Sequence, residues 1–267
     1  MSTRGSVCLL QTMAAAGEHC PPQQAERLQQ ELLSAALSLS LPPPLLAAHI
    51  AALATVAADG GWAPPLVSAA ERVVAGFVER VQAGYAVYDA DLDGVCAALF
   101  AIGESAAASG CPVGSQVVVL VQALLSPTHT LGASQGGSAP STVPHRVQAL
   151  AWTTLGKLCL VNAALAKRCA PVFVQELART PLPAVRNNIL VVLRDLCVHF
   201  TALVDGHVPT LLRATFDPHV LVRTQALALL ANLLQKVRVW WHELCLLLVY
   251  ASLSTWASMA CYHARIT

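Results

Sequence analysis

The chain of 267 residues is dominated by hydrophobic side chains, which make up 55% of it, whereas charged side chains make up only 12% and leave a net charge of +1. Its mean hydropathy of +0.57 is high for a soluble protein. Much of the apolar content is Ala and Leu, which suit packed helices. The scarcity of aromatic residues and of alternating apolar and polar positions argues against a β-sheet protein.

Helical periodicity recurs along the first half of the chain, after an N-terminal segment, 1–22, that is expected to be disordered. Breaks fall at turn-forming residues, such as the three prolines at 42–44 and the Asp-Gly-Gly at 59–61. Residues 23–126 are therefore expected to be helical, with helices at 23–41, 45–58, 64–82, 89–108 and 113–125.

A loop rich in Gly, Ser and Pro at 127–144 separates this region from a clearer helical one at 145–235. Pro171 and Pro209, 38 positions apart, are each expected to open an apolar-periodic stretch. Asp217-Pro218 is typical of a helix start, with Asp as the cap. The predicted helix pairs are 146–160 with 164–180 and 183–199 with 206–216, followed by a helix at 218–235.

Three segments of this second region repeat one another at spacings of 38 and 37 residues, beginning at Val147, Val185 and Val222. A period near 40 with two helices per unit is typical of HEAT or armadillo repeats, which stack into solenoids. The predicted fold class is therefore all-α, a HEAT/armadillo-type α-solenoid of stacked two-helix repeats. Residues 145–235 are expected to form clear HEAT repeats and residues 23–126 degenerate HEAT-like ones. The large apolar residues at equivalent helical steps are expected to be buried: Trp152, Leu155, Leu158, Leu190, Leu193, Leu196, Leu227, Leu230 and Leu233.

Charge is distributed unevenly along the chain. Residues 1–143 hold 4 basic and 10 acidic side chains, whereas residues 144–238 hold 11 basic and 4 acidic ones. A basic solenoid face can attract nucleic acid or acidic protein segments, although solvated helix faces explain most single charges.

The last segment, 236–267, differs from the repeats because their period stops at Gln235. Residues 244–262 carry no charge and are long enough for a membrane span by hydropathy alone. We expect 236–267 to lie outside the native repeat stack. Lys236-Val237-Arg238 is a run that reading through a splice donor could encode, so the apolar stretch would be a by-product of non-coding translation.

Motifs that suggest chemistry are incomplete. Asp89–Gly94 matches the first half of a calcium-binding EF-hand loop, but Phe100 stands where the bidentate Glu is required, so an acidic first helical turn is preferred. Gly132–Gly136 matches the Gly-x-Ser-x-Gly of a nucleophile elbow without a strand before it. The nine Cys include no Cys-x-x-Cys pair, which favours reduced intracellular thiols, several of them at apolar positions such as Cys159 and Cys197. The sequence predicts no enzyme, cofactor, metal or small-molecule substrate.

Several segments closely resemble the D-type HEAT subunits of condensin, in particular those of condensin II. They are Leu-Gly-Lys-Leu-Cys at 155–159, Val-Arg-Asn-Asn at 185–188, Asp-Leu-Cys at 195–197, Val-Asp-Gly-His-Val-Pro at 204–209 and Leu-Ala-Asn-Leu-Leu-Gln at 230–235. The resemblance runs from about residue 85 to 235, and the chain looks like an internal piece of such a subunit. It implies a chromosomal scaffold in the nucleus that supports mitotic chromosome condensation, binds kleisin, DNA and chromatin, and works with the SMC subunits.

Four arginines of the basic region are candidate DNA or partner contacts: Arg186, Arg194, Arg213 and Arg223. Arg186 and Arg223 occupy the same repeat position, and a structural alternative is that each binds an Asp of a neighbouring turn. Two other functions stay open. One is an adaptor solenoid of the transport or phosphatase type that grips acidic peptides, and the less favoured one is a membrane-anchored helical protein.

Overall fold

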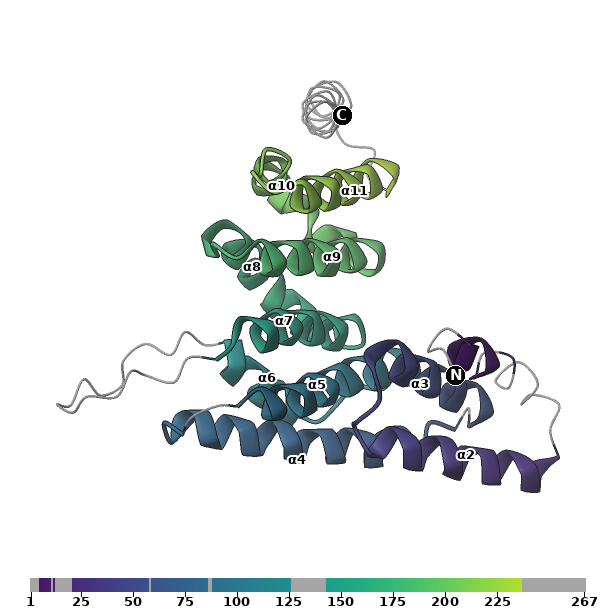
Figure 1. The fold of residues 1–267 in the computed structure, drawn as a ribbon. Coiled ribbons are helices and arrows are strands. Elements are labelled where there is room, and N and C mark those ends of the chain that lie inside the picture. The colour runs from purple at the N-terminus through teal and green to yellow at the C-terminus, as the bar shows by residue number, and fades with distance from the viewer. Residues whose placement is uncertain are drawn as a thin grey trace, which may run out of the picture. The chain divides into compact units, whose positions relative to one another are not determined.

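A computed structural model describes residues 5–10, 12, 21–57, 59–85, 88–125 and 143–236. Every regular element in these described residues is a helix, which confirms the predicted all-α fold class (Figure 1). The chain divides into two compact units, with the boundary between Val161 and Asn162. Residues 5–10, within the segment expected to be disordered, are helical.

The first unit contains helices that follow the predicted ranges closely. Three of the six, α2, α3 and α4, begin with Pro in the first turn, where the missing N–H has no intrahelical partner to lose. The longest ends at Gly110, whose φ of 66° is the left-handed conformation that commonly terminates a helix. The helices are α2 (Pro22–Leu37), α3 (Pro43–Val56), α4 (Ala63–Gln82), α5 (Asp89–Ser109), α6 (Ser115–Leu125) and α7 (His145–Leu160).

These helices form pairs arranged in two layers. α2 packs on α3, α4 on α5, and α6 on α7, while α2, α4 and α6 make one layer and α3, α5 and α7 the other. α5 lies at the centre and is covered by α3, α4 and α7. Over Asp91–Ser109 it is long and apolar enough to cross a membrane, but 56% of that stretch is buried, as is usual for the core helix of a stacked fold.

α5 and α7 approach each other closely at Gly103. A Cβ at this position would lie 3.1 Å from Lys157 Cδ and 3.5 Å from Thr154 Cα, so an alanine here would require the Lys157 side chain to shift by a few tenths of an ångström. The buried Thr154 hydroxyl donates a hydrogen bond of 3.0 Å to the Leu99 carbonyl oxygen across this contact. The Lys157 ammonium pairs with the Glu104 carboxylate. Polar contacts therefore fix the register between two largely apolar helices.

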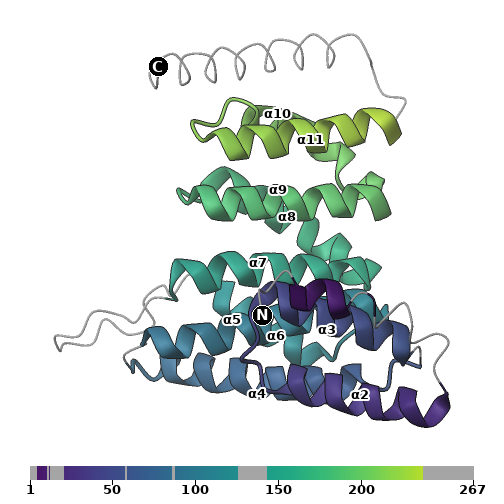
Figure 2. The same cartoon turned by 45° about the vertical axis from the view of Figure 1, so that its right-hand side comes forward.

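The second unit repeats the two-layer arrangement. α8 packs on α9 and α10 on α11, with α8 and α10 in one layer and α9 and α11 in the other (Figures 1 and 2). Two short 3-10 turns, Thr201–Leu203 and Asp205–His207, connect α9 to α10. The helices are α8 (Ala163–Arg179), α9 (Pro183–His199), α10 (Val208–Ala214) and α11 (Val220–Lys236).

The sequence repeat corresponds to a repeated buried face. Val147, Val185 and Val222 are all at most 1% exposed, and so are the residues four positions after each of them. Eight of the nine apolar residues predicted to be buried are buried. The exception is Leu227, which is only half-buried, whereas the equivalent Trp152 and Leu190 are buried.

Two other sequence predictions were wrong. The helix pairs are α8 with α9 and α10 with α11, one helix out of step with the predicted pairing. Pro171 does not open a helix but lies inside α8, which begins eight residues earlier. The start of α8 is capped by the Asn162 side chain, which accepts a hydrogen bond of 3.0 Å from the Leu165 N–H. Pro171 is exposed, so its ring lies on the outer side of the helix.

Candidate interaction surface

Arg186 is held by two turns of the second unit. Its Nε and Nη2 donate to Asp217 Oδ2 and Oδ1 at 2.7 and 3.0 Å, and its Nη1 donates to the Thr180 carbonyl oxygen at 3.1 Å. The Arg186 and Asp217 side chains are only 13% and 9% exposed. Two roles were considered for Arg186, a DNA contact and a structural contact with an Asp of a neighbouring turn. The structure shows the second.

Arg223 occupies the equivalent position in α11 and makes an equivalent backbone contact. Its Nη1 donates to the carbonyl oxygens of Asp217 and Pro218 at 2.9 and 3.0 Å. Asp217 precedes Arg223 by six residues, as Thr180 precedes Arg186. Because Arg223 is only 9% exposed, both arginines of the repeat mainly fix the turn that leads into their own helix.

Arg194 and Arg213 are more accessible than this pair. The Arg194 side chain is 35% exposed; it lies 3.7 Å from the Asp195 carboxylate and 3.5 Å from the Gln225 amide oxygen. Arg213, in the last turn of α10, is exposed, and its guanidinium makes no hydrogen bond or ion pair within the described part of the chain. Of the four candidate arginines, Arg213 offers a guanidinium that an outside partner could reach without breaking an internal contact.

Sequence reasoning missed three exposed basic residues on α8: Lys167, Arg168 and Arg179. The signal was present, because the buried positions of α8 recur at helical steps and leave these residues on the outer face. Burial raises the pKa of Glu176, and the nearby Arg179 opposes this rise. We call four exposed residues the basic group: Lys167, Arg168, Arg179 and Arg213. All four belong to the layer made by α8 and α10.

The acidic motif at 89–94 forms the first turns of α5, as the helical interpretation predicted. Asp91 Oδ1 lies 3.0 Å from Arg80 Nη1 of α4, and Asp93 Oδ1 lies 2.7 Å from Arg146 Nη1 of α7. An EF-hand requires this segment to be a loop whose oxygens converge on one ion. Here the two carboxylates instead tie α5 to two different helices.

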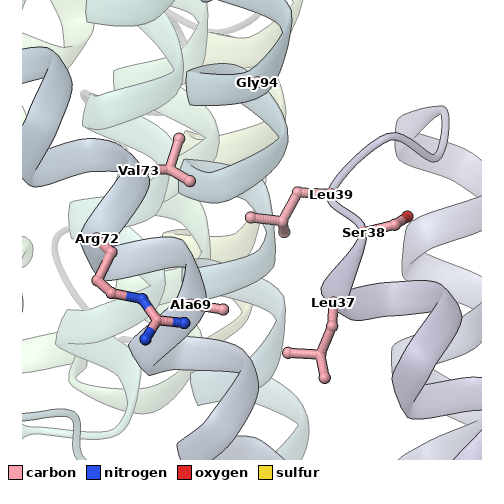
Figure 3. Close-up of a pocket in the computed structure, with 7 residues that line it drawn as sticks. All are labelled: Leu37, Ser38, Leu39, Ala69, Arg72, Val73 and Gly94. Carbon is pink, nitrogen blue, oxygen red and sulfur yellow. The ribbon is translucent and has the colours of Figure 1, made fainter.

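A shallow hollow of about 440 Å³ lies in the first unit, between the α2–α3 connection, α4 and α5 (Figure 3). Leu37 and Leu39 extend toward α4, whereas the Ser38 side chain points away from the hollow. Arg72 is the one ionisable residue in its lining, which comprises Leu37, Ser38, Leu39, Ala69, Arg72, Val73 and Gly94. The hollow therefore lacks the paired acid, base or nucleophile that an active site needs.

Three sequence features fall outside the described residues: the Gly132–Gly136 motif, the loop around it, and the uncharged stretch at 244–262. Within the described residues, no group of three or more His, Cys, Asp or Glu side chains is placed to hold a metal ion. Cys159 and Cys197, predicted at apolar positions, are buried.

Comparison with known proteins finds relatives for part of the chain. Residues 93–177 match the model of the family described as condensin-2 complex subunit D3-like, HEAT repeats. Over 157 residues the chain is 38% identical to condensin-2 complex subunit D3 of Mus musculus and 35% identical to condensin-2 complex subunit D3-L of Xenopus laevis. Over 91 residues it is 42% identical to condensin-2 complex subunit CAP-D3 of Arabidopsis thaliana, an alignment that covers 34% of this chain and 7% of that relative.

The two longer alignments each cover 54% of this chain and 10% of the relative. The chain thus spans about a tenth of the length of these curated relatives. The matched residues include α5 to α8, whose paired and layered packing has been described above. Over about half of its length the chain is similar to condensin-2 D3 subunits, and residues 93–177 match the HEAT-repeat model of that family.

Proposed function

We propose that this chain acts as part of a non-catalytic scaffold of a condensin complex and binds kleisin together with DNA or chromatin. In this role it would contact the SMC subunits and work in the nucleus on mitotic chromosomes. The similarity to condensin-2 D3 subunits carries the proposal, since no other feature of the chain points to a particular assembly.

The basic group supports the DNA part of the proposal. Lys167, Arg168, Arg179 and Arg213 are exposed on one layer of the second unit. Among the acids there, Asp217 is already paired with Arg186 and Asp195 lies near Arg194. Lys and Arg side chains that neutralise phosphates release counterions, and this release drives sequence-independent binding to duplex DNA.

The test is binding of the full chain to a labelled DNA duplex across a range of salt concentrations. We expect the logarithm of the binding constant to fall linearly with the logarithm of salt, with a slope of about −0.9 for each phosphate neutralised. The adaptor alternative predicts binding to acidic peptides and none to the duplex. A chain that binds no duplex at low salt would remove the DNA part of the proposal.

A membrane-anchored protein is the third candidate. It relies on residues 244–262, which lie outside the described residues, and α5, the described helix that is apolar enough, is mostly buried. Alkaline carbonate extraction of membranes separates the candidates: a scaffold is released, whereas an anchored protein stays with the lipid.

A further inference from the structure

Large apolar side chains are exposed at the turn between α10 and α11. Phe216 is 52% exposed, Val220 44% and Leu221 60%, and Pro218 between them is exposed as well. Three of the eleven most exposed large apolar residues in the described chain thus fall within six positions, so their exposure is concentrated at one place. Contiguous exposed apolar residues commonly mark a protein interaction site.

The backbone of this turn is fixed. Arg223 Nη1 donates to the carbonyl oxygens of Asp217 and Pro218, and the Asp217 carboxylate accepts hydrogen bonds from Arg186 and from the His219 N–H. The exposed side chains are therefore presented from a turn that two arginines hold in place. A surface that is already ordered loses less conformational entropy when it binds.

The equivalent turn between α8 and α9 extends the apolar surface. Arg186 hydrogen-bonds both the Thr180 carbonyl oxygen in that turn and the Asp217 carboxylate in the next, so one guanidinium joins the two turns. Pro181 is exposed and Leu182 half-buried. We call the combined surface the edge strip; its residues are Pro181, Leu182, Phe216, Pro218, Val220 and Leu221.

Positive charge borders the edge strip. Arg179 and Arg213 are exposed in the last turns of α8 and α10, immediately before the two connecting turns. Of the acids near these turns, Asp217 is paired with Arg186. Burial raises the pKa of the Glu176 carboxyl, which lies near Arg179, and so favours its neutral form. A partner that matches the strip must therefore combine apolar side chains with carboxylates.

We infer that the edge strip docks a short peptide segment of a partner protein, in which aliphatic or aromatic side chains alternate with Asp or Glu. The apolar side chains would pack on Phe216 and Leu221, and the carboxylates would pair with the guanidiniums of Arg179 and Arg213, which match a carboxylate in shape and charge. This inference rests on the proposed scaffold function, because it gives that scaffold a surface for recognising a subunit or recruited protein.

The experiment selects peptides on the full chain. A phage library of random 12-residue peptides is enriched on the immobilised 267-residue protein, with counter-selection on a Phe216→Ser, Leu221→Ser double variant. The enriched peptides are synthesised, and their binding is measured by fluorescence anisotropy. We expect a consensus of apolar and acidic residues, with affinity at least about tenfold weaker for the double variant and for Arg213→Glu.

Matched controls separate the edge strip from general surface effects. Val198→Ser removes an apolar side chain that is 46% exposed near the far end of α9, and Arg72→Glu reverses an exposed charge on α4 in the first unit. Both controls are expected to bind the peptides as the parent does. Circular dichroism and thermal melting of each variant verify that it is folded.

Three results would overturn the inference. The first is a consensus without acidic residues, and the second is a consensus peptide that binds the double variant as tightly as the parent. The third is concentration-dependent self-association of the chain through the edge strip. Loss of duplex DNA binding in the double variant, with peptide binding intact, would also contradict it, because the strip would then be a DNA contact. Because the peptide assay contains no DNA or condensin subunit, its failure would be separate from a failure of the proposed function.

Discussion

Arg186 and Asp217, 31 positions apart, form a two-point ion pair that joins consecutive helix pairs in the second unit. The same guanidinium also binds the carbonyl oxygen of Thr180, six residues before it, and Arg223 repeats this backbone contact with Asp217. A conspicuous sequence feature, the recurring Val-Arg pair, thus corresponds to a recurring hydrogen bond. Both arginines bind Asp217: Arg186 through its carboxylate and Arg223 through its carbonyl oxygen.

Removing Asp217 should destabilise the chain strongly. Asp217→Ala leaves the buried Arg186 guanidinium without its carboxylate, and breaking a buried ion pair in this way costs about 3–5 kcal/mol of unfolding free energy. Urea unfolding of the full chain measures the loss. The exposed Asp205 is the matched control, and Asp205→Ala is expected to change the free energy by about 0.5 kcal/mol or less. Equal effects of the two substitutions would show that the pair has no structural role.

Leu193 tests the repeated core. It is fully buried in α9, so Leu193→Ala is expected to lower the unfolding free energy by about 2–5 kcal/mol through reduced burial and the cavity left behind. Leu221, 60% exposed in α11, provides the same substitution without a cavity and should cost far less. If the two variants unfolded at the same urea concentration, the assignment of the buried face would be wrong.

The exposed arginines should differ from the buried ones in DNA binding. Arg213→Ala and Arg168→Ala are expected to weaken duplex binding uniformly across sequences and to flatten the salt slope by about one for each phosphate that is no longer neutralised. Their melting temperatures should stay close to that of the parent. Arg186→Ala and Arg223→Ala are instead expected to lower the melting temperature, since both guanidiniums are bonded inside the chain.

Whether Arg186 and Arg223 also contact DNA directly is tested by the DNA affinity and melting temperature of the same alanine variants. Reduced duplex affinity with an unchanged melting temperature would assign them to the DNA contact. An unchanged affinity together with an unchanged melting temperature in the double Ala variant would remove both roles.

Glu176 should make stability depend on pH. Burial raises its folded-state pKa above the ordinary value of 4.5, with Arg179 opposing the rise, so the folded chain holds this proton to higher pH than the unfolded chain does. Its contribution to the unfolding free energy must therefore fall as pH rises through this interval. Glu176→Gln cannot lose a proton, and we expect the variant to be the more stable form at neutral pH.

The measurement is urea unfolding of both proteins between about pH 4 and pH 7. The difference in unfolding free energy between variant and parent should grow with pH over the lower part of this range. A constant difference would mean that Glu176 titrates at the same pH in the folded and unfolded chains.

The sequence predicted the helices well because Pro and Gly mark their ends. The prediction of 89–108 for α5 differs by one residue from the observed Asp89–Ser109, and Pro183 begins α9 as expected. The pairing of helices was wrong because periodicity identifies which face of a helix is buried but not which neighbour covers it. Pro171 misled because a proline inside a helix costs one hydrogen bond to the carbonyl four residues earlier, and the packing of α8 outweighs that cost, so Pro171 did not mark a boundary.

Less of the candidate surface could be predicted. The structural alternative for Arg186 was correct, but nothing in the sequence assigned its partner, because Asp217 was expected to cap the last helix. The exposure of Phe216 and Leu221 was not predicted either, since a large apolar residue beside a helix normally packs inward. Their exposure follows from the three-dimensional path of the turn, which Arg223 fixes through the carbonyl oxygens of Asp217 and Pro218 and Arg186 through the Asp217 carboxylate.

The most direct test of the proposed scaffold role is co-purification of the full chain with the kleisin subunit of condensin II. The two proteins are expressed together, and their association is followed by size-exclusion chromatography with the Asp217→Ala and Phe216→Ser, Leu221→Ser variants in parallel. The account predicts that the parent chain elutes in a stoichiometric complex with kleisin, and that Asp217→Ala, which disturbs the repeat stack, weakens it. A folded parent chain that elutes alone in the presence of excess kleisin would contradict the account.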